Sequence, residues 1–111
     1  MSLWLLEVII ESVRNYLKKV QKEGFIIRFG VIFGSQVTGQ ADRWSDIDLL
    51  VVSPRFDGSR DRRDIDLMWR LAARTDSRIE PIPCGERQWE DDVSSAVVEI
   101  ARREGETVTL H

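Results

Sequence analysis

The stretch VIFGSQVTGQADRWSDIDLLVV, residues 31–52, decides how the rest of the sequence is interpreted. It opens inside an apolar segment rich in β-branched and aromatic residues, 25–33, which predicts a buried strand. Gly34 and Ser35 follow at once, and a glycine-serine pair at the end of a strand allows a tight turn with exposed backbone N–H groups. Turns of this kind hold phosphate oxygens, although the pair alone would also fit an ordinary turn.

Ten residues further on, Asp46 and Asp48 open a second predicted strand, residues 46–52. Side chains two residues apart in a strand point to the same face, so these carboxylates would lie side by side, with Ile47 turned into the core. Two like charges on one face repel each other unless a cation is present. On geometry alone the pair fits a metal site and two carboxylates that stay in water at the strand end equally well, and the glycine-serine turn before it favours the metal site.

The tetrapeptide DIDL occurs a second time, with Asp64 and Asp66, inside a predicted helix at residues 60–75. Residues i and i+2 of a helix lie about 200° apart around its axis, so these two carboxylates could not share an ion. They are expected to be surface charge, with nearby arginines as partners: Arg60, Arg62, Arg63 and Arg70. The geometry thus favours the first copy as the site.

The remaining segments predict further helices and strands. They are an amphipathic helix at 3–22, a short strand at 78–82, a helix at 86–104 and a terminal strand or tail at 106–110. Pro81 and Pro83 are expected to cut the short strand off. The last helix is expected to bury Trp89, Val93, Ala96, Val97 and Ile100. Tryptophans on apolar helix faces are expected to pack: Trp4, Trp69 and Trp89.

Composition limits the class of protein. With 111 residues, the chain is expected to form one domain, 1–111. A net charge of −3 argues against a broad basic surface, so no direct binding of nucleic acid is expected. Cys84 is the only cysteine, and we find no signal peptide or membrane-spanning run, so we expect a cytoplasmic protein without membrane contact. His111 is the only histidine, which argues against a histidine-based triad or zinc site.

The combination of a glycine-serine turn, a ten-residue spacer and an Asp-x-Asp strand is similar to the nucleotidyltransferase superfamily that includes polymerase beta. Within it, the chain resembles the minimal nucleotidyltransferase (MNT) proteins, the antitoxin half of HEPN/MNT pairs. The resemblance implies an α/β (α+β) fold with a small mixed β-sheet and helices packed on it. It also implies that Gly34 and Ser35 bind the β- and γ-phosphates of a nucleotide and that Asp46 and Asp48 bind two Mg²⁺ ions.

Members of this superfamily usually carry a third carboxylate on a later strand, and Glu80 is the best match here. Its alternative role is an exposed charge paired with Arg78 or a neighbour. Relatives often have basic residues just after the glycine-serine pair, whereas this chain has Gln36 and Thr38. Arg43, in the same loop, could supply the missing charge.

The resemblance implies an enzyme that transfers NMP from an NTP, with ATP as the expected donor, to a hydroxyl group. In the antitoxin family this acceptor is a tyrosine of the HEPN toxin, which makes such a toxin the expected partner, while homo-oligomerisation stays open. The alternative is a non-catalytic antitoxin that masks its partner. Small-molecule modifiers of the same superfamily need additional substrate-binding helices, for which 111 residues leave little room.

Overall fold

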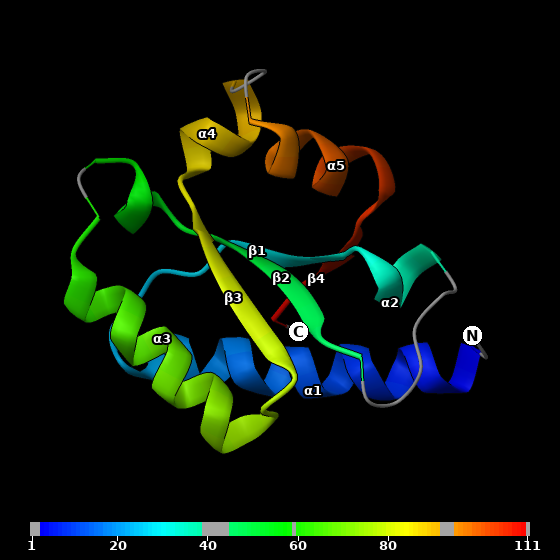
Figure 1. Ribbon diagram of the computed structural model, residues 1–111. Helices are drawn as coiled ribbons and strands as arrows, with labels where there is room; N and C mark the ends of the chain where they lie inside the picture. The colour runs from blue at the N-terminus through cyan, green and yellow to red at the C-terminus, as the bar shows by residue number, and fades with distance from the viewer. Residues whose placement is uncertain (1–2, 39–44, 59, 92–94, 111) are drawn as a thin grey trace.

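The computed structural model describes residues 3–38, 45–58, 60–91 and 95–110 (Figure 1). In chain order the elements are α1 (Leu3–Lys22), β1 (Phe29–Phe33), α2 (Ser35–Thr38), β2 (Ile47–Val52), the 3-10 turn η1 (Pro54–Phe56), α3 (Arg62–Thr75), β3 (Ile79–Cys84), α4 (Glu86–Asp91), α5 (Ala96–Glu104) and β4 (Glu106–Val108). The strands form one sheet in the order β3-β2-β1-β4. β2 and β3 are parallel and the other neighbours are antiparallel, which confirms the predicted small mixed sheet.

Helices cover both faces of the sheet, with α1 and α3 below it and α4 and α5 above it in Figure 1. Successive strand residues point to opposite faces, so neighbouring positions of β2 belong to two different cores. The core under α1 and α3 includes Ile9, Val13, Leu17, Ile47, Leu49, Val51, Met68 and Ile79. The core under α4 and α5 consists of Val31, Phe33, Leu50, Val52, Cys84, Val98 and Ala101.

The first helix forms as its apolar spacing predicts. Ile9, Val13, Leu17 and Val20 recur every three or four residues and are all fully buried. Tyr16 lies on the same face and donates its hydroxyl proton to the carbonyl of Met68 at 2.9 Å, which ties α1 to α3. The chain then turns at Gly24, whose φ of 103° is open to glycine at no steric cost.

The first strand begins at Phe29, four residues later than predicted. Phe25 and Ile27 are buried as a strand would bury them, but they have no partner strand. The antiparallel partner β2 ends at Val52, opposite Phe29, and the chain then turns into η1. Apolar sequence therefore marks burial only in part here, since Ile26 is 60% exposed, and the length of β1 is set by its partner.

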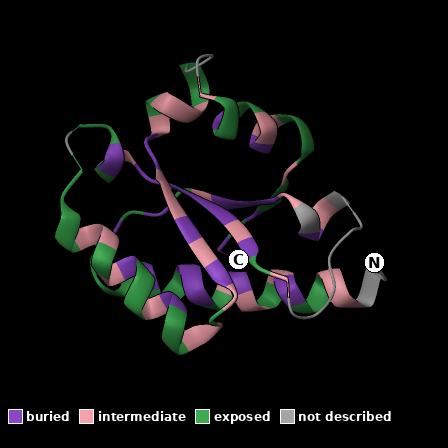
Figure 2. Ribbon diagram, in the orientation of Figure 1, coloured by how far each residue is buried: buried purple, intermediate pink, exposed green. Residues whose placement is uncertain are grey.

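The prediction that the prolines cut the third strand short is wrong, because β3 runs through both of them to Cys84. Ile47 N–H donates to the carbonyl of Arg78, and Ser53 N–H donates to the carbonyl of Cys84, so the even-numbered residues of β3 bond to β2. Pro81 and Pro83 fall between them, and their nitrogens face the free edge, where proline is tolerated. Figure 2 shows buried and half-buried positions along this edge strand.

The helix predicted at 86–104 is two helices, α4 and α5. Ser95 caps the second, its hydroxyl accepting from Val98 N–H at 3.3 Å, so the helical register restarts there. As a result Val98 and Ala101 face the core, whereas Ala96 and Val97, predicted to be buried, are exposed. Val93 lies outside the described residues.

The predicted packing of the tryptophans holds in part. Trp89 is half-buried and meets Phe29 edge to face, with ring centroids 5.4 Å apart. Trp69 is 46% exposed, contrary to the prediction, because Met68 and Ala72 turn their side of α3 to the core. The side chain of Trp4 lies outside the described part of the chain.

Candidate functional site

The turn after β1 depends on a glycine. Gly34 has a φ of 76°, which disfavours any residue with a Cβ. A Cβ at this position would lie 2.5 Å from Oδ2 of Asp48, closer than real Cβ contacts come. The turn thus brings backbone against a carboxylate of the neighbouring strand, and α2 begins directly after it at Ser35.

Sheet register brings two of the predicted carboxylates together. Asp48 pairs with Phe33 of β1 on one side and with Glu80 of β3 on the other. All three side chains lie on the α4/α5 face, because the neighbouring positions Ile47, Leu49 and Ile79 belong to the core under α1 and α3. Asp46 lies one residue before the first residue of β2 and is exposed, whereas Asp48 and Glu80 are half-buried.

Electrostatics couple Glu80 to both aspartates. Burial raises the pKa of the Glu80 carboxyl above its ordinary value, and the negative charges of Asp46 and Asp48, together with hydrogen bonding to them, raise it further. Both aspartates therefore act on the Glu80 carboxyl, although the three residues are spread over 35 residues of sequence. Among the described residues, the ion pair of Arg78 is with Asp76. The alternative, an ion pair between Glu80 and Arg78, is therefore not seen among them.

The donor set fits Mg²⁺ in its chemistry. Carboxylate oxygens are the ligands that this ion takes from proteins, and one or two of them suffice, with water and phosphate oxygens completing the octahedron. Among the described residues, no three His, Cys, Asp or Glu side chains converge into a ready-made metal cage. The pairing of Asp48 with Glu80 across β2 and β3 still offers the one or two carboxylates that the ion needs.

The start of β3 is held by a polar network that the sequence did not single out. Asp76 accepts from Ser12 Oγ at 2.8 Å and from Arg78 Nη2 at 2.7 Å, and the Arg78 side chain lowers the pKa of the Asp76 carboxyl. The carbonyl of Arg78 in turn accepts from Ile47 N–H at 2.7 Å. These contacts join α1, β3 and β2 just before the level at which Asp48 meets Glu80.

Gln36 is a second residue whose role the sequence did not show. It was singled out for lacking a positive charge, but its side chain is fully buried. Nε2 donates to the carbonyls of Ser45 and Asp46, at 3.0 and 3.1 Å. A basic side chain at position 36 would therefore lie in the interior. Its absence removes no positive charge from a surface that faces a nucleotide.

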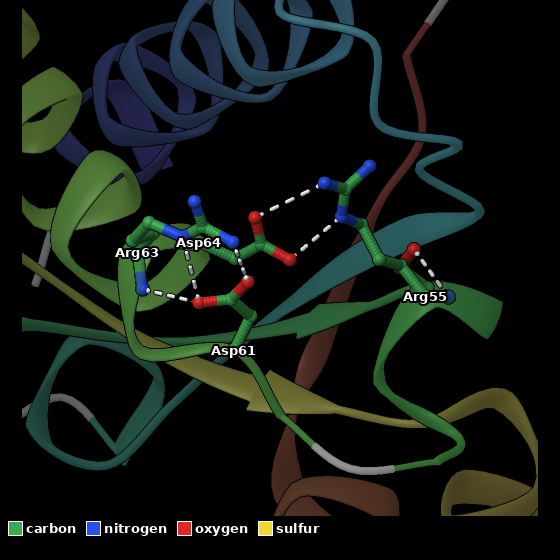
Figure 3. A network of polar contacts seen from close by, with 5 residues as sticks. Arg55, Asp61, Arg63 and Asp64 are labelled. Carbon is green, nitrogen blue, oxygen red and sulfur yellow. Dashed lines mark hydrogen bonds and ion pairs between the residues drawn. The ribbon is translucent and has the colours of Figure 1, made fainter.

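The second DIDL lies on α3, as predicted, and its two carboxylates have separate surroundings. Arg55 of η1 binds both oxygens of Asp64, at 2.7 and 3.0 Å (Figure 3). Its guanidinium carbon also lies 4.2 Å from the centroid of the Phe25 ring. Asp66 is exposed on the helix. The expected partners were wrong for Asp64, since Arg63 binds Asp61, the residue that caps α3. Asp64 is thus a link between η1 and α3.

Two sequence predictions at the site fall outside the described residues. They concern the Ser35 hydroxyl and Arg43. The backbone of Ser35 is described and begins α2. In the part of the chain that the structure covers, no helix combines the length and the apolar character needed to cross a bilayer.

Comparison with known proteins identifies the family. A family model described as nucleotidyltransferase domain matches residues 10–103, which is most of the chain and includes every carboxylate of the site. The chain belongs to this family of nucleotidyltransferase domains, as the glycine-serine and Asp-x-Asp pattern implied.

Among solved structures, the chain is similar to one described as the crystal structure of a toxin-antitoxin with AMP-PNP. The sequences are 21% identical, the TM-score is 0.56, and the match covers 85% of this chain and 70% of the other. At that identity the similarity establishes a shared fold. No curated protein matches the chain.

Proposed function

We propose that this domain transfers NMP from an NTP, with ATP as the donor, to a hydroxyl group of a partner protein, with release of pyrophosphate. The observation that carries the proposal is the sheet register that sets Asp48 between the Gly34 turn and Glu80. A triphosphate bound at that turn would lie directly beside the carboxylates. Membership of the nucleotidyltransferase domain family supports the same reaction class.

The proposed roles follow from position. Asp46 and Asp48 would hold two Mg²⁺ ions together with Glu80, and Gly34 and Ser35 would bind the triphosphate. When bound, the ions would neutralise charge on the phosphates and lower the pKa of the acceptor hydroxyl. Glu80 lies on β3, one strand beyond Asp48 as counted from β1 and its Gly34 turn, so it is assigned to the acceptor side. Its raised pKa suits a group that takes up a proton from the acceptor.

The acceptor is proposed to be a tyrosine of a HEPN-type toxin, and the domain its antitoxin. Transfer requires the acceptor oxygen to be oriented toward the α-phosphorus, and orientation accounts for several kcal/mol of such a barrier. Tyr16 is the only tyrosine of this chain, and it is fully buried with its hydroxyl bound to the carbonyl of Met68, so it is not placed as that acceptor. The fold shared with a protein from a toxin-antitoxin structure supports a toxin as the partner.

The test is transfer of label from radioactive ATP. The purified domain is incubated with Mg²⁺ and with the protein encoded by the neighbouring gene, and labelling is followed with and without a chelator. We expect label on the partner, dependent on Mg²⁺ and lost in Asp46→Asn, with almost none on the domain itself or on small alcohols. Efficient transfer to a small alcohol without the partner would contradict the proposal.

A further inference from the structure

One side chain joins the Gly34 turn to the first carboxylate of the site. Gln36 is the second residue of α2, and this short helix is closed onto the turn by a hydrogen bond from Val37 N–H to the carbonyl of Gly34 at 3.1 Å. The Gln36 amide reaches the chain again at Ser45 and Asp46, where it bridges their two carbonyls. The turn and Asp46 are thereby held as one unit.

Asp46 needs such a contact more than Asp48 does. Asp48 lies within β2 and is fixed by ladder pairing to strands on both sides. Asp46 precedes the first ladder residue, is exposed, and is itself held through its carbonyl by Gln36. Since the carboxylate is attached to the same residue, a backbone shift at this carbonyl moves the carboxylate with it.

The burial of Gln36 is unfavourable on packing grounds alone. Its Oε1 is buried and accepts no hydrogen bond from the residues that the structure describes. A buried acceptor without a donor destabilises the fold, and an apolar side chain of similar length would avoid that loss. The two bonds donated by Nε2 are therefore the chemical feature that distinguishes Gln36 from a methionine at the same place.

We propose that Gln36 is a positioning residue, which sets the Asp46 carboxylate relative to the Gly34 turn through the backbone of Ser45 and Asp46. The inference rests on the proposed function, because it assumes that Asp46 binds a divalent ion. Groups that orient a metal ligand typically change metal affinity or activity by about 10- to 100-fold when they are removed. Gln36 would do this from the interior, without touching the ion or the nucleotide.

The test compares Gln36→Met with Ser53→Ala in the whole domain. Ser53 is also fully buried and polar, but it lies at the opposite end of β2, where its hydroxyl accepts from Arg55 N–H. Two quantities are measured: the Mn²⁺ dissociation constant, from the loss of the free-ion electron paramagnetic resonance signal, and the carbonyl ¹³C shifts of Ser45 and Asp46 without metal. Thermal melting of both variants controls for global destabilisation.

We expect Gln36→Met to weaken Mn²⁺ binding by about 10- to 100-fold and to move both carbonyl shifts, with a change in melting temperature no larger than that of Ser53→Ala. Ser53→Ala should leave Mn²⁺ affinity within about twofold. Unchanged affinity in Gln36→Met, while the wild type binds Mn²⁺ through Asp46, would overturn the positioning role alone. If the wild type binds no Mn²⁺, the proposed function fails and this inference fails with it. Gln36→Asn, whose amide is one methylene shorter, serves if Gln36→Met does not fold.

Discussion

Replacing Gly34 with alanine tests the contact between the turn and the carboxylates. The substitution has two separable effects. Alanine at a φ of 76° is strained, and the left-handed region costs an L-residue about 1–2 kcal/mol. In addition, the new Cβ would lie 2.5 Å from Oδ2 of Asp48, so that carboxylate must retreat by about 1 Å to reach ordinary contact. A displacement of that size at a reacting centre can cost about 100-fold in rate.

Gly24→Ala is the matched control. Gly24 also has a positive φ, 103°, but nothing lies within 4 Å of the position that a Cβ would take there. Backbone strain should lower the free energy of unfolding of both variants by about 1–2 kcal/mol. In domains of about this size, each kcal/mol lowers the melting temperature by roughly 4–8 °C. Only Gly34→Ala should also lose affinity for Mg-ATP and transfer activity.

A double-mutant cycle isolates the clash. In an Asp48→Ala background the carboxylate is gone, so Gly34→Ala should cost only the strain energy, as Gly24→Ala does. Urea denaturation gives the free energies of unfolding, and isothermal titration with Mg-ATP gives the affinities. Equal loss of stability for Gly34→Ala in both backgrounds, with unchanged ATP affinity in the single variant, would refute the reasoning.

The remaining predictions concern the carboxylates. Asp46→Asn with Asp48→Asn should abolish divalent-ion binding and leave the melting temperature of the ion-free domain equal or higher, since like charges are removed; a clear fall would make the pair structural. Glu80→Gln should lower the transfer rate with ATP affinity retained, and equal loss of both would contradict its acceptor-side role. Because the Glu80 pKa is raised in the fold, the stability that its protonated carboxyl contributes is present at low pH and is lost as pH rises through that pKa. Glu80→Gln keeps a neutral side chain at every pH, so urea titrations should show its free energy of unfolding increasingly exceeding that of the wild type as pH rises. Asp64→Asn should keep transfer activity within about twofold, because both oxygens of Asp64 are bound by Arg55; loss of activity there would point to the second DIDL.

Much of the fold follows from local pattern. The helix α1 has its predicted bounds because its apolar periodicity and the turn at Gly24 are both local signals. The predictions fail where the structure of a segment depends on a partner segment elsewhere in the chain. β1 starts at Phe29 because β2 ends opposite it, and β3 passes Pro81 because β3 is an edge strand. Neither fact can be read from the residues of the strand concerned.

The candidate site likewise has a part that local sequence pattern predicts and a part that it does not. Choosing the first DIDL over the second needs only the difference between strand and helix periodicity, and the structure places Asp48 on β2 and Asp64 on α3 accordingly. The role of Gln36 could not be found from sequence, because an uncharged residue after a glycine-serine pair looks like a missing phosphate contact. The contacts of Gln36 depend on a distant part of the chain, because Ser45 must lie beside α2 for the amide to bind its carbonyl.

Register makes the fold and the site inseparable. A slip of one residue between strands would turn every side chain of β2 to the opposite face. Asp48 would then enter the apolar core under α1 and α3, and Leu49 would face Glu80. The burial of Ile47, Leu49 and Val51 opposes that slip strongly, so the same apolar residues that stabilise the sheet also hold Asp48 against the Gly34 turn. A substitution in this core that shifted β2 would therefore impair the site without touching any of its carboxylates.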